Sequence, residues 1–112
     1  MAAELNRFRT VTADITTVNE ILYTAPLGKT TIILMAQASN ISETVNEISF
    51  LHFDAATNAE TELVKRFSVP PNDATSVITG KLIVEEGNSV RAFASAEDSF
   101  KMTLSILESL NA

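Results

Sequence analysis

"FKMTLSILESL", Phe100–Leu110, is the stretch that decides the fold class. Apolar and polar side chains alternate along it with the period of two that characterises a β-strand with one buried face. The apolar face carries Phe100, Met102, Leu104 and Ile106, and the opposite face carries Lys101, Thr103 and Ser105. The stretch therefore predicts a strand, with a helical ending over its last five residues as the alternative.

The segment before it, "VPPNDATSVITGKLIVEEGNSVRAFAS" (Val69–Ser95), contains two turn signals. Pro71–Asp73 is typical of one turn, and Gly87–Asn88 tolerates the positive φ of a second. Between them, Thr75–Glu86 predicts one long strand that Gly80 kinks or bulges. The remaining residues, SVRAFAS, predict the first strand of a closing hairpin.

Two strands and a buried run precede this segment. From Phe8 onward, Phe8, Thr10 and Thr12 share one predicted strand face, and Arg9, Val11, Ala13 and Ile15 share the other. A second strand, Val18–Pro26, ends at a proline, which cannot donate to a strand ladder. The apolar run Thr31–Ala36 is short and uninterrupted, so it predicts a central strand buried on both faces.

Two further alternating segments complete the pattern. The first, NEISFLHFDA, sets Ile48, Phe50 and His52 against Ser49, Leu51 and Phe53, and the second, ETELVKRFSVP, sets Leu63, Lys65, Phe67 and Val69 against Val64, Arg66 and Ser68. The whole chain then predicts an all-β protein with a single antiparallel β-sandwich or jelly-roll-like domain of seven to eight short strands, a small barrel being the alternative. We expect residues 1–7 to form a flexible N-terminal arm and residues 8–112 to form the sandwich.

Composition narrows the function. The 112 residues are 46% hydrophobic and 20% charged, as in a globular domain, and carry a formal net charge of −6. This charge disfavours nucleic acid as a partner, because phosphate backbones attract clustered Lys and Arg. The chain has no cysteine, and its apolar runs are too short for a signal peptide or a membrane span. We therefore expect no disulfide and no membrane contact.

No arrangement of residues predicts catalysis, a cofactor or a metal. The single histidine, His52, has no second His or Cys to complete a metal site. Glu85 and Glu86, taken with Glu97 or Asp98, are candidates for the carboxylate pair of a glycosidase, but acids at hairpin ends are usually solvated. The spacing needed for calcium, for a phosphate loop after Gly28 or for a nucleophilic serine is missing. The chain is predicted not to be an enzyme.

Two longer stretches of the sequence resemble a known protein family. "ILYTAPLGKTTIILMAQASNIS" and "LVKRFSVPPNDATSVITGKLIVEEGNSVRAFAS" resemble a family of small virion proteins of tailed bacteriophages, closest to those of marine and cyanobacterial phages. The matching positions in the first half are Tyr23, Thr24, Ala25, Pro26, Gly28, Lys29, Thr30 and Asn40. The second half shares a Pro-x-Asn turn, a Gly-Lys-Leu strand and an EEGDS-type hairpin, in which this chain has Asn88 instead of Asp.

The resemblance implies a non-enzymatic structural protein of the virion, assembled in the host cytoplasm, either as capsid decoration or cement or as a neck or tail component. It would form a symmetric homo-oligomer, a trimer first of all, on other virion proteins such as the major capsid, neck or tail proteins. Unpaired strand edges would allow it to extend a neighbour's sheet. Candidate protein contacts are Phe8, the turn of Val69, Pro70, Pro71, Asn72 and Asp73, and the C-terminal Leu107 and Leu110.

Two other classes stay open. A host-surface or carbohydrate-binding module would use the same sandwich, with Tyr23 or Phe93 near its site, although the chain lacks the tryptophan common in sugar-binding sites. A small cupin-like enzyme would require a bound metal.

Overall fold

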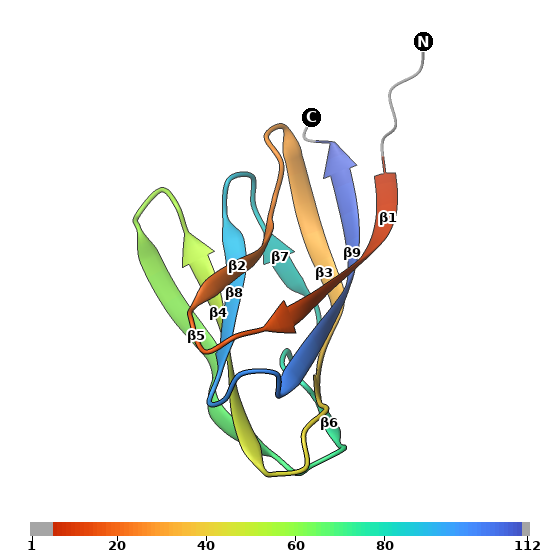
Figure 1. The fold of residues 1–112 in the computed structure, drawn as a ribbon. Helices are drawn as coiled ribbons and strands as arrows, with labels where there is room; N and C mark the ends of the chain where they lie inside the picture. The colour runs from red at the N-terminus through yellow and green to blue at the C-terminus, as the bar shows by residue number, and fades with distance from the viewer. Residues whose placement is uncertain (1–5, 111–112) are drawn as a thin grey trace.

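The structure is a computed structural model that describes residues 6–110, which form nine strands and no helix. The strands are β1 (Asn6–Ile15), β2 (Glu20–Thr24), β3 (Lys29–Asn40), β4 (Asn46–Asp54), β5 (Ala59–Val69), β6 (Ala74–Ser76), β7 (Leu82–Val84), β8 (Ser89–Ala94) and β9 (Phe100–Leu110). They lie in two layers (Figure 1). The predicted all-β antiparallel sandwich is confirmed, with nine strands in place of seven to eight.

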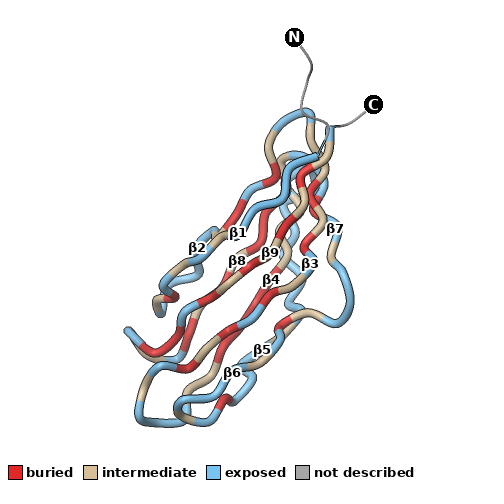
Figure 2. The backbone as a smooth tube through the Cα atoms, turned by 90° about the vertical axis from the view of Figure 1, so that its right-hand side faces the viewer, coloured by how far each residue is buried: buried red, intermediate tan, exposed pale blue. Residues whose placement is uncertain are grey.

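The two layers are antiparallel sheets. Sheet A has the order β1-β9-β3-β6, with β7 also pairing with β3, and sheet B has the order β2-β8-β4-β5. The outermost strands are mostly exposed, and the buried residues concentrate on the central strands between the layers (Figure 2). The molecule is elongated along the strands, with extents of 51 × 28 × 22 Å.

Strand β9 lies at the centre of sheet A, between β1 and β3, and follows the predicted alternation. Phe100, Met102, Leu104 and Ile106 are each 1% exposed. The strand continues to Leu110, which pairs with Lys29 of β3, so the helical ending does not form. Two neighbouring strands satisfy its backbone hydrogen bonds along the whole length, so a helical turn at its end would break these bonds.

Strand β3 is central, but it is buried on one face only. Ile33, Ala36 and Ala38 are fully buried, whereas Ile32 and Met35 are half-buried and Leu34 is exposed. The expectation of burial on both faces was wrong, because a two-layer sandwich leaves the outer face of each sheet without a third layer.

Thr75–Glu86 does not form the predicted single strand. It gives two three-residue strands, β6 and β7, which pair with opposite halves of β3. Between them, the N–H of Val77 donates to the carbonyl of Ala36 at 3.0 Å, and the chain then bends outward through Gly80 at φ +75°. Burial of the Val77 side chain and the left-handed glycine together interrupt the ladder.

Strand β5 alternates differently from the prediction. Val64 lies opposite the buried Phe50, and Phe67 lies opposite the buried Ile48, so the register puts Val64 and Phe67 on the same side of the strand. Val64 packs against the core, whereas Phe67 is 50% exposed at the sheet edge. Two register shifts insert extra residues, and Arg66 adopts φ +50° at one of them. Each extra residue in a bulge reverses the alternation after it.

Strand β1 runs along sheet A, and the chain then crosses to sheet B. The N–H of Ala94 in β8 donates to the carbonyl of Thr16 at 2.8 Å, after which β2 pairs with β8. Asn6 and Arg7, which we placed in the arm, are the first two residues of β1. The rest of the proposed arm lies outside the described residues.

Candidate assembly surfaces

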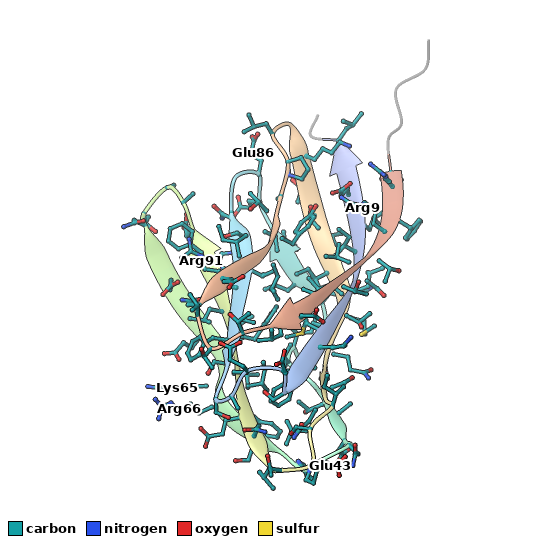
Figure 3. All side chains as sticks on the ribbon, viewed as in Figure 1. Arg9, Glu43, Lys65, Arg66, Glu86 and Arg91 are labelled. Atoms are coloured by element: carbon teal, nitrogen blue, oxygen red, sulfur yellow. The ribbon has the colours of Figure 1, made fainter. Side chains whose placement is uncertain are left out.

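A buried polar cluster ties β1 to the rest of the sandwich. Glu108 of β9 is 2% exposed, and its Oε2 accepts hydrogen bonds from the Tyr23 hydroxyl of β2 and, at 3.2 Å, from Nη1 of Arg9 in β1. The Tyr23 hydroxyl also lies 2.7 Å from Oγ1 of the buried Thr31. Arg9 itself is partly exposed beside the paired strands β1 and β9 (Figure 3).

The electrostatics of this cluster favour an ionised Glu108 beside a protonated Tyr23. Burial raises the pKa of Glu108, but the hydrogen bond from Tyr23 and the Arg9 guanidinium outweigh it, so the pKa lies below the ordinary value. Burial and the hydrogen bond to Glu108 raise the pKa of Tyr23 to about 12. A charge buried this deeply is stable only with its partners present, so the cluster fixes β1 and β2 against β9.

The outer face of sheet A carries an apolar row that crosses four strands. Phe8 of β1 lies opposite Leu107 of β9, Leu107 opposite Ile32 of β3, and Ile32 opposite Ile83 of β7. Phe8 is 73% exposed and Ile83 is 59% exposed. Cross-strand neighbours on one sheet face touch one another, so these four side chains form a continuous solvent-facing row, which we call the apolar row.

The predicted contact residues divide between the two ends of the sandwich. Phe8, Leu107 and the exposed Leu110 lie at the end where β1 begins and β9 finishes, and the Pro70–Asp73 turn lies at the other end, beside β6 (Figure 1). The sequence identified Phe8 and Leu107 separately, and the strand register brings them together. The apolar row also includes Ile32 and Ile83, which sequence reasoning missed because the pairing of β3 with β7 was unknown.

The turn after β5 is exposed but firmly held. Asp73 donates its N–H to the carbonyl of Pro70 at 3.3 Å, and its own carbonyl accepts from the N–H of Asn40 at 2.8 Å. Asn72 has the left-handed φ of +59°. Val69, in contrast, is 1% exposed and packs in the hydrophobic cluster between the sheets. Val69 therefore belongs to the core, and Pro70–Asp73 form the exposed surface.

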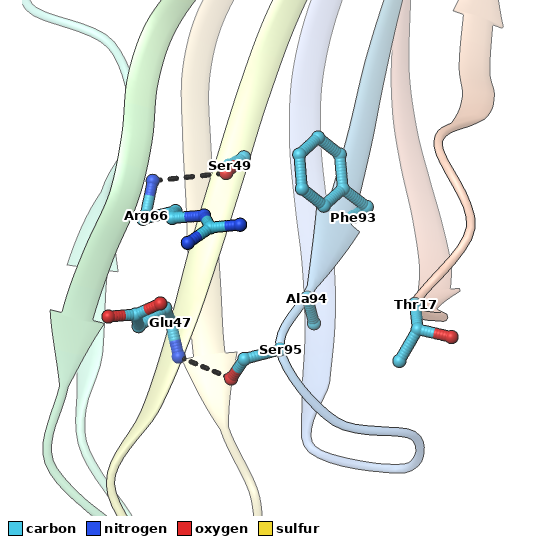
Figure 4. Close-up of a pocket in the computed structure, with 7 residues that line it drawn as sticks. All are labelled: Thr17, Glu47, Ser49, Arg66, Phe93, Ala94 and Ser95. Atoms are coloured by element: carbon cyan, nitrogen blue, oxygen red, sulfur yellow. Dashed lines mark hydrogen bonds between the residues drawn. The ribbon is translucent and has the colours of Figure 1, made fainter.

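A shallow hollow lies over β4 and β8 of sheet B (Figure 4). It is lined by Thr17, Glu47, Ser49, Arg66, Phe93, Ala94 and Ser95. The backbone N–H of Arg66 donates to Oγ of Ser49 at 3.0 Å, and that of Glu47 donates to Oγ of Ser95 at 2.8 Å. The hollow thus offers one cation, one carboxylate and one aromatic ring. Arg66 lines the hollow because it lies in a β-bulge with φ +50°. The sequence contains no signal that predicts this bulge.

The residues considered for a carbohydrate site do not meet. Phe93 lines the hollow on the outer face of sheet B, whereas Tyr23 is buried between the sheets and bonded to Glu108. Tyr23 pairs with Val90 of β8, which is three residues from Phe93. Residues an odd number of positions apart in a strand point to opposite faces, so Tyr23 and Phe93 lie on opposite faces of sheet B. Only Phe93 is available to a ligand at the hollow.

The acidic residues considered for catalysis are also apart. Glu86 accepts from the N–H of Gly28 at 2.8 Å in the turn before β8, and Glu97 accepts from Oγ1 of Thr17 at 2.7 Å in the turn after β8. The backbone N–H of Thr17 also donates to Glu97, at 3.2 Å, and the two hydrogen bonds from Thr17 lower the pKa of Glu97. Because β8 separates the two turns, they give no carboxylate pair.

Residues 6–110 also lack two other features. No group of three His, Cys, Asp or Glu side chains within this range is placed to hold a metal ion. This range also has no helix long and apolar enough to cross a membrane.

Comparison with known proteins shows the fold. No protein-family model and no curated protein sequence matches the chain. Among solved structures, a chain of the Bacillus endospore appendages, described as disulfide-linked pili, matches with a TM-score of 0.56 at 11% identity over 96% of this chain and 88% of that one. A chain of infectious bursal disease virus, Gx strain, matches with a TM-score of 0.52 at 8% identity over 96% of this chain and 33% of that one.

The chain shares their fold. A pentameric capsid protein from metagenomic phage sequences matches more distantly, with a TM-score of 0.40 at 13% identity over 89% of this chain and 61% of that one. At these identities the likeness establishes architecture, and function has to be argued from the surfaces described above.

Proposed function

We propose that this chain is a non-enzymatic structural protein of a tailed-phage virion that assembles as a symmetric homo-oligomer on the particle. The observation that carries the proposal is the outer face of sheet A, where the apolar row ends at the open edge strand β1. A solvent-facing apolar row beside an unpaired edge is typical of a surface that another protein covers.

Two further observations support this role. The titratable groups in the described residues are dispersed or, as with Glu108, committed to holding strands together. Two matches with TM-scores above 0.5 come from a pilus and a virus, both of which are assemblies. The pilus is described as disulfide-linked, whereas this chain has no cysteine, so its own assembly would rest on non-covalent contacts.

The proposed location on the particle is the exterior of the capsid, as decoration or cement, or the neck or tail. The net charge of −6 opposes a place against packaged DNA. The proposed partners are further copies of this chain, in a trimer as the sequence resemblance implies, and the major capsid, neck or tail proteins.

Mass spectrometry of purified virions tests the proposal. We expect the chain to remain in the particles after nuclease and detergent washing. Its copy number then distinguishes a capsid location from a neck or tail location. A number comparable with that of the shell protein indicates decoration, and a low number indicates the neck or tail. Absence from washed particles, with the protein abundant in infected cells, would overturn the virion role.

A second function is favoured by one observation, the hollow with Phe93, Arg66 and Glu47. An aromatic face beside charged groups suits a sugar or a receptor segment. A glycan array with the wild-type protein and a Phe93→Ala variant tests it. Saturable binding that the variant loses would support host-surface recognition, and silence on the array would count against it.

A further inference from the structure

Among the sheet edges formed by residues 6–110, only β1 is both long and regular. β1 pairs with β9 over ten residues, Asn6 to Ile15, without a register shift. At the opposite edge of sheet A, β6 and β7 have three residues each. In sheet B, β2 has five residues and one shift, and β5 has two shifts. Short strands and bulges discourage pairing with other chains, and β1 has neither.

The side chains on the outer face of β1 are also suited to close approach. Phe8, Thr10 and Thr12 are uncharged and exposed. Two of the three charged residues of the strand form ion pairs: Arg9 contacts Glu108 at 3.2 Å, and Asp14 contacts Lys101 at 3.6 Å. The third, Arg7, is exposed. Threonine is favourable in cross-strand pairs. With two arginines and one aspartate, the strand has a formal charge of +1 in a chain whose net charge is −6, so two copies of this edge repel each other only weakly.

We propose that β1 pairs antiparallel with β1 of a second copy, around a two-fold axis perpendicular to sheet A that passes beside Thr10. This inference rests on the proposed self-assembly and names the strand that carries it. The open backbone groups of each edge would satisfy those of the other, and the two five-stranded sheets would become one continuous sheet.

The register follows from the pleat and the charges. A two-fold axis perpendicular to the sheet keeps outer side chains opposite outer side chains, so only every second register is allowed. Centred on Thr10, the pairing places Phe8 opposite Thr12 and Asn6 opposite Asp14. Centred on Phe8, it would place Arg7 opposite Arg9, and centred on Val11, it would place Phe8 opposite Asp14. The register at Thr10 avoids both conflicts and still uses residues 6–14.

The pairing constrains the oligomer. A two-fold contact alone gives a dimer, and combined with the three-fold contact of the proposed trimer it joins two trimers into a hexamer. In either case the number of copies is even. The apolar row of each copy would reach the new interface at Phe8, so the dimer would present two such rows on one outer face.

The experiment is the mass of the purified full chain in solution, by light scattering and sedimentation, for the wild type and three variants. Thr10→Lys places two like charges opposite each other at the axis and should weaken self-association by about tenfold or more. Thr10→Glu should do the same, and an equal mixture of the two variants should restore the wild-type mass. Gln37→Lys, an exposed position on β3 of sheet A, is the matched control and should keep the wild-type mass.

Three results would overturn the inference: a wild type that is monomeric or odd-numbered, a Thr10→Lys variant that associates as the wild type does, or a mixture that fails to restore the mass. Denaturant unfolding of each variant confirms that it is folded. The measurement needs no phage particle, so failure of this pairing and absence of the chain from virions are separate outcomes.

Discussion

β1 and β5 are the two long edge strands of this molecule, and they treat their open edges in opposite ways. β1 keeps one register over ten residues, whereas β5 shifts register twice within eleven. β5 also carries Glu60, Glu62, Lys65 and Arg66, and the last two point outward (Figure 3). Bulges and charges of this kind discourage strand addition. A long edge strand is therefore not sufficient for pairing with another chain; it must also be regular and free of outward-pointing charges.

The contrast between β1 and β5 requires that the strands beside them, β9 and β4, are equally well packed. Leu104 of β9 is 1% exposed beneath the β1 side, and Phe50 of β4 is fully buried beside β5. We expect Leu104→Ala and Phe50→Ala each to lower the free energy of unfolding by about 3 kcal/mol, because each leaves a cavity in a packed core. Urea unfolding measures both. A small loss at either position would show that the strand under that edge is loosely packed.

The next largest effect concerns the anchor that only β1 has. Glu108→Ala removes the partner of Tyr23 and Arg9 and should cost about 2 kcal/mol of unfolding free energy. It should also speed hydrogen exchange at the start of β1. Glu62→Ala, at an exposed glutamate of β5, is the control and should stay within about 0.5 kcal/mol of the wild type. Equal losses from the two variants would contradict the anchoring role.

A smaller effect of opposite sign is expected in β5. Arg66 has φ +50°, a conformation that costs an L-residue about 1–2 kcal/mol and glycine almost nothing. Because glycine loses more backbone entropy on folding, Arg66→Gly should stabilise the fold by a net of about 0.5–1 kcal/mol. Lys65→Gly, one residue away, has only the entropic cost and should destabilise. If both variants destabilise equally, the left-handed bulge is not where the structure places it.

The smallest effect is a pH dependence. The folded state holds the pKa of Glu108 below its ordinary value of 4.5, so ionised Glu108 stabilises the fold above that value. This contribution is lost as pH falls through 4.5 towards the folded pKa. In Glu108→Gln, the stability difference between neutral and acidic pH should therefore be smaller than in the wild type, by denaturant unfolding at each pH. An unchanged or larger difference would show that Glu108 is not the ionised partner of Arg9.

Sequence patterns predicted most of the architecture and little of the surface geometry. The alternation of Phe100–Ile106 gave β9 its core face correctly, since a period of two has one physical interpretation in a two-layer fold. The same argument failed in β5, because the left-handed conformation of Arg66 has no signature when the residue is not glycine. Of the apolar row, the sequence identified only Phe8 and Leu107. Ile83 lies in the same row because distant segments of the chain pair as neighbouring strands.

The pairing of β1 with a second copy can be detected by hydrogen exchange resolved to single amides, measured at low and high protein concentration. We expect alternate amides of Asn6–Asp14, those pointing away from β9, to gain protection as concentration rises, while the amides at the edge of β5 stay unchanged. Gain of protection confined to β5, or no gain in β1 at any concentration, would contradict it.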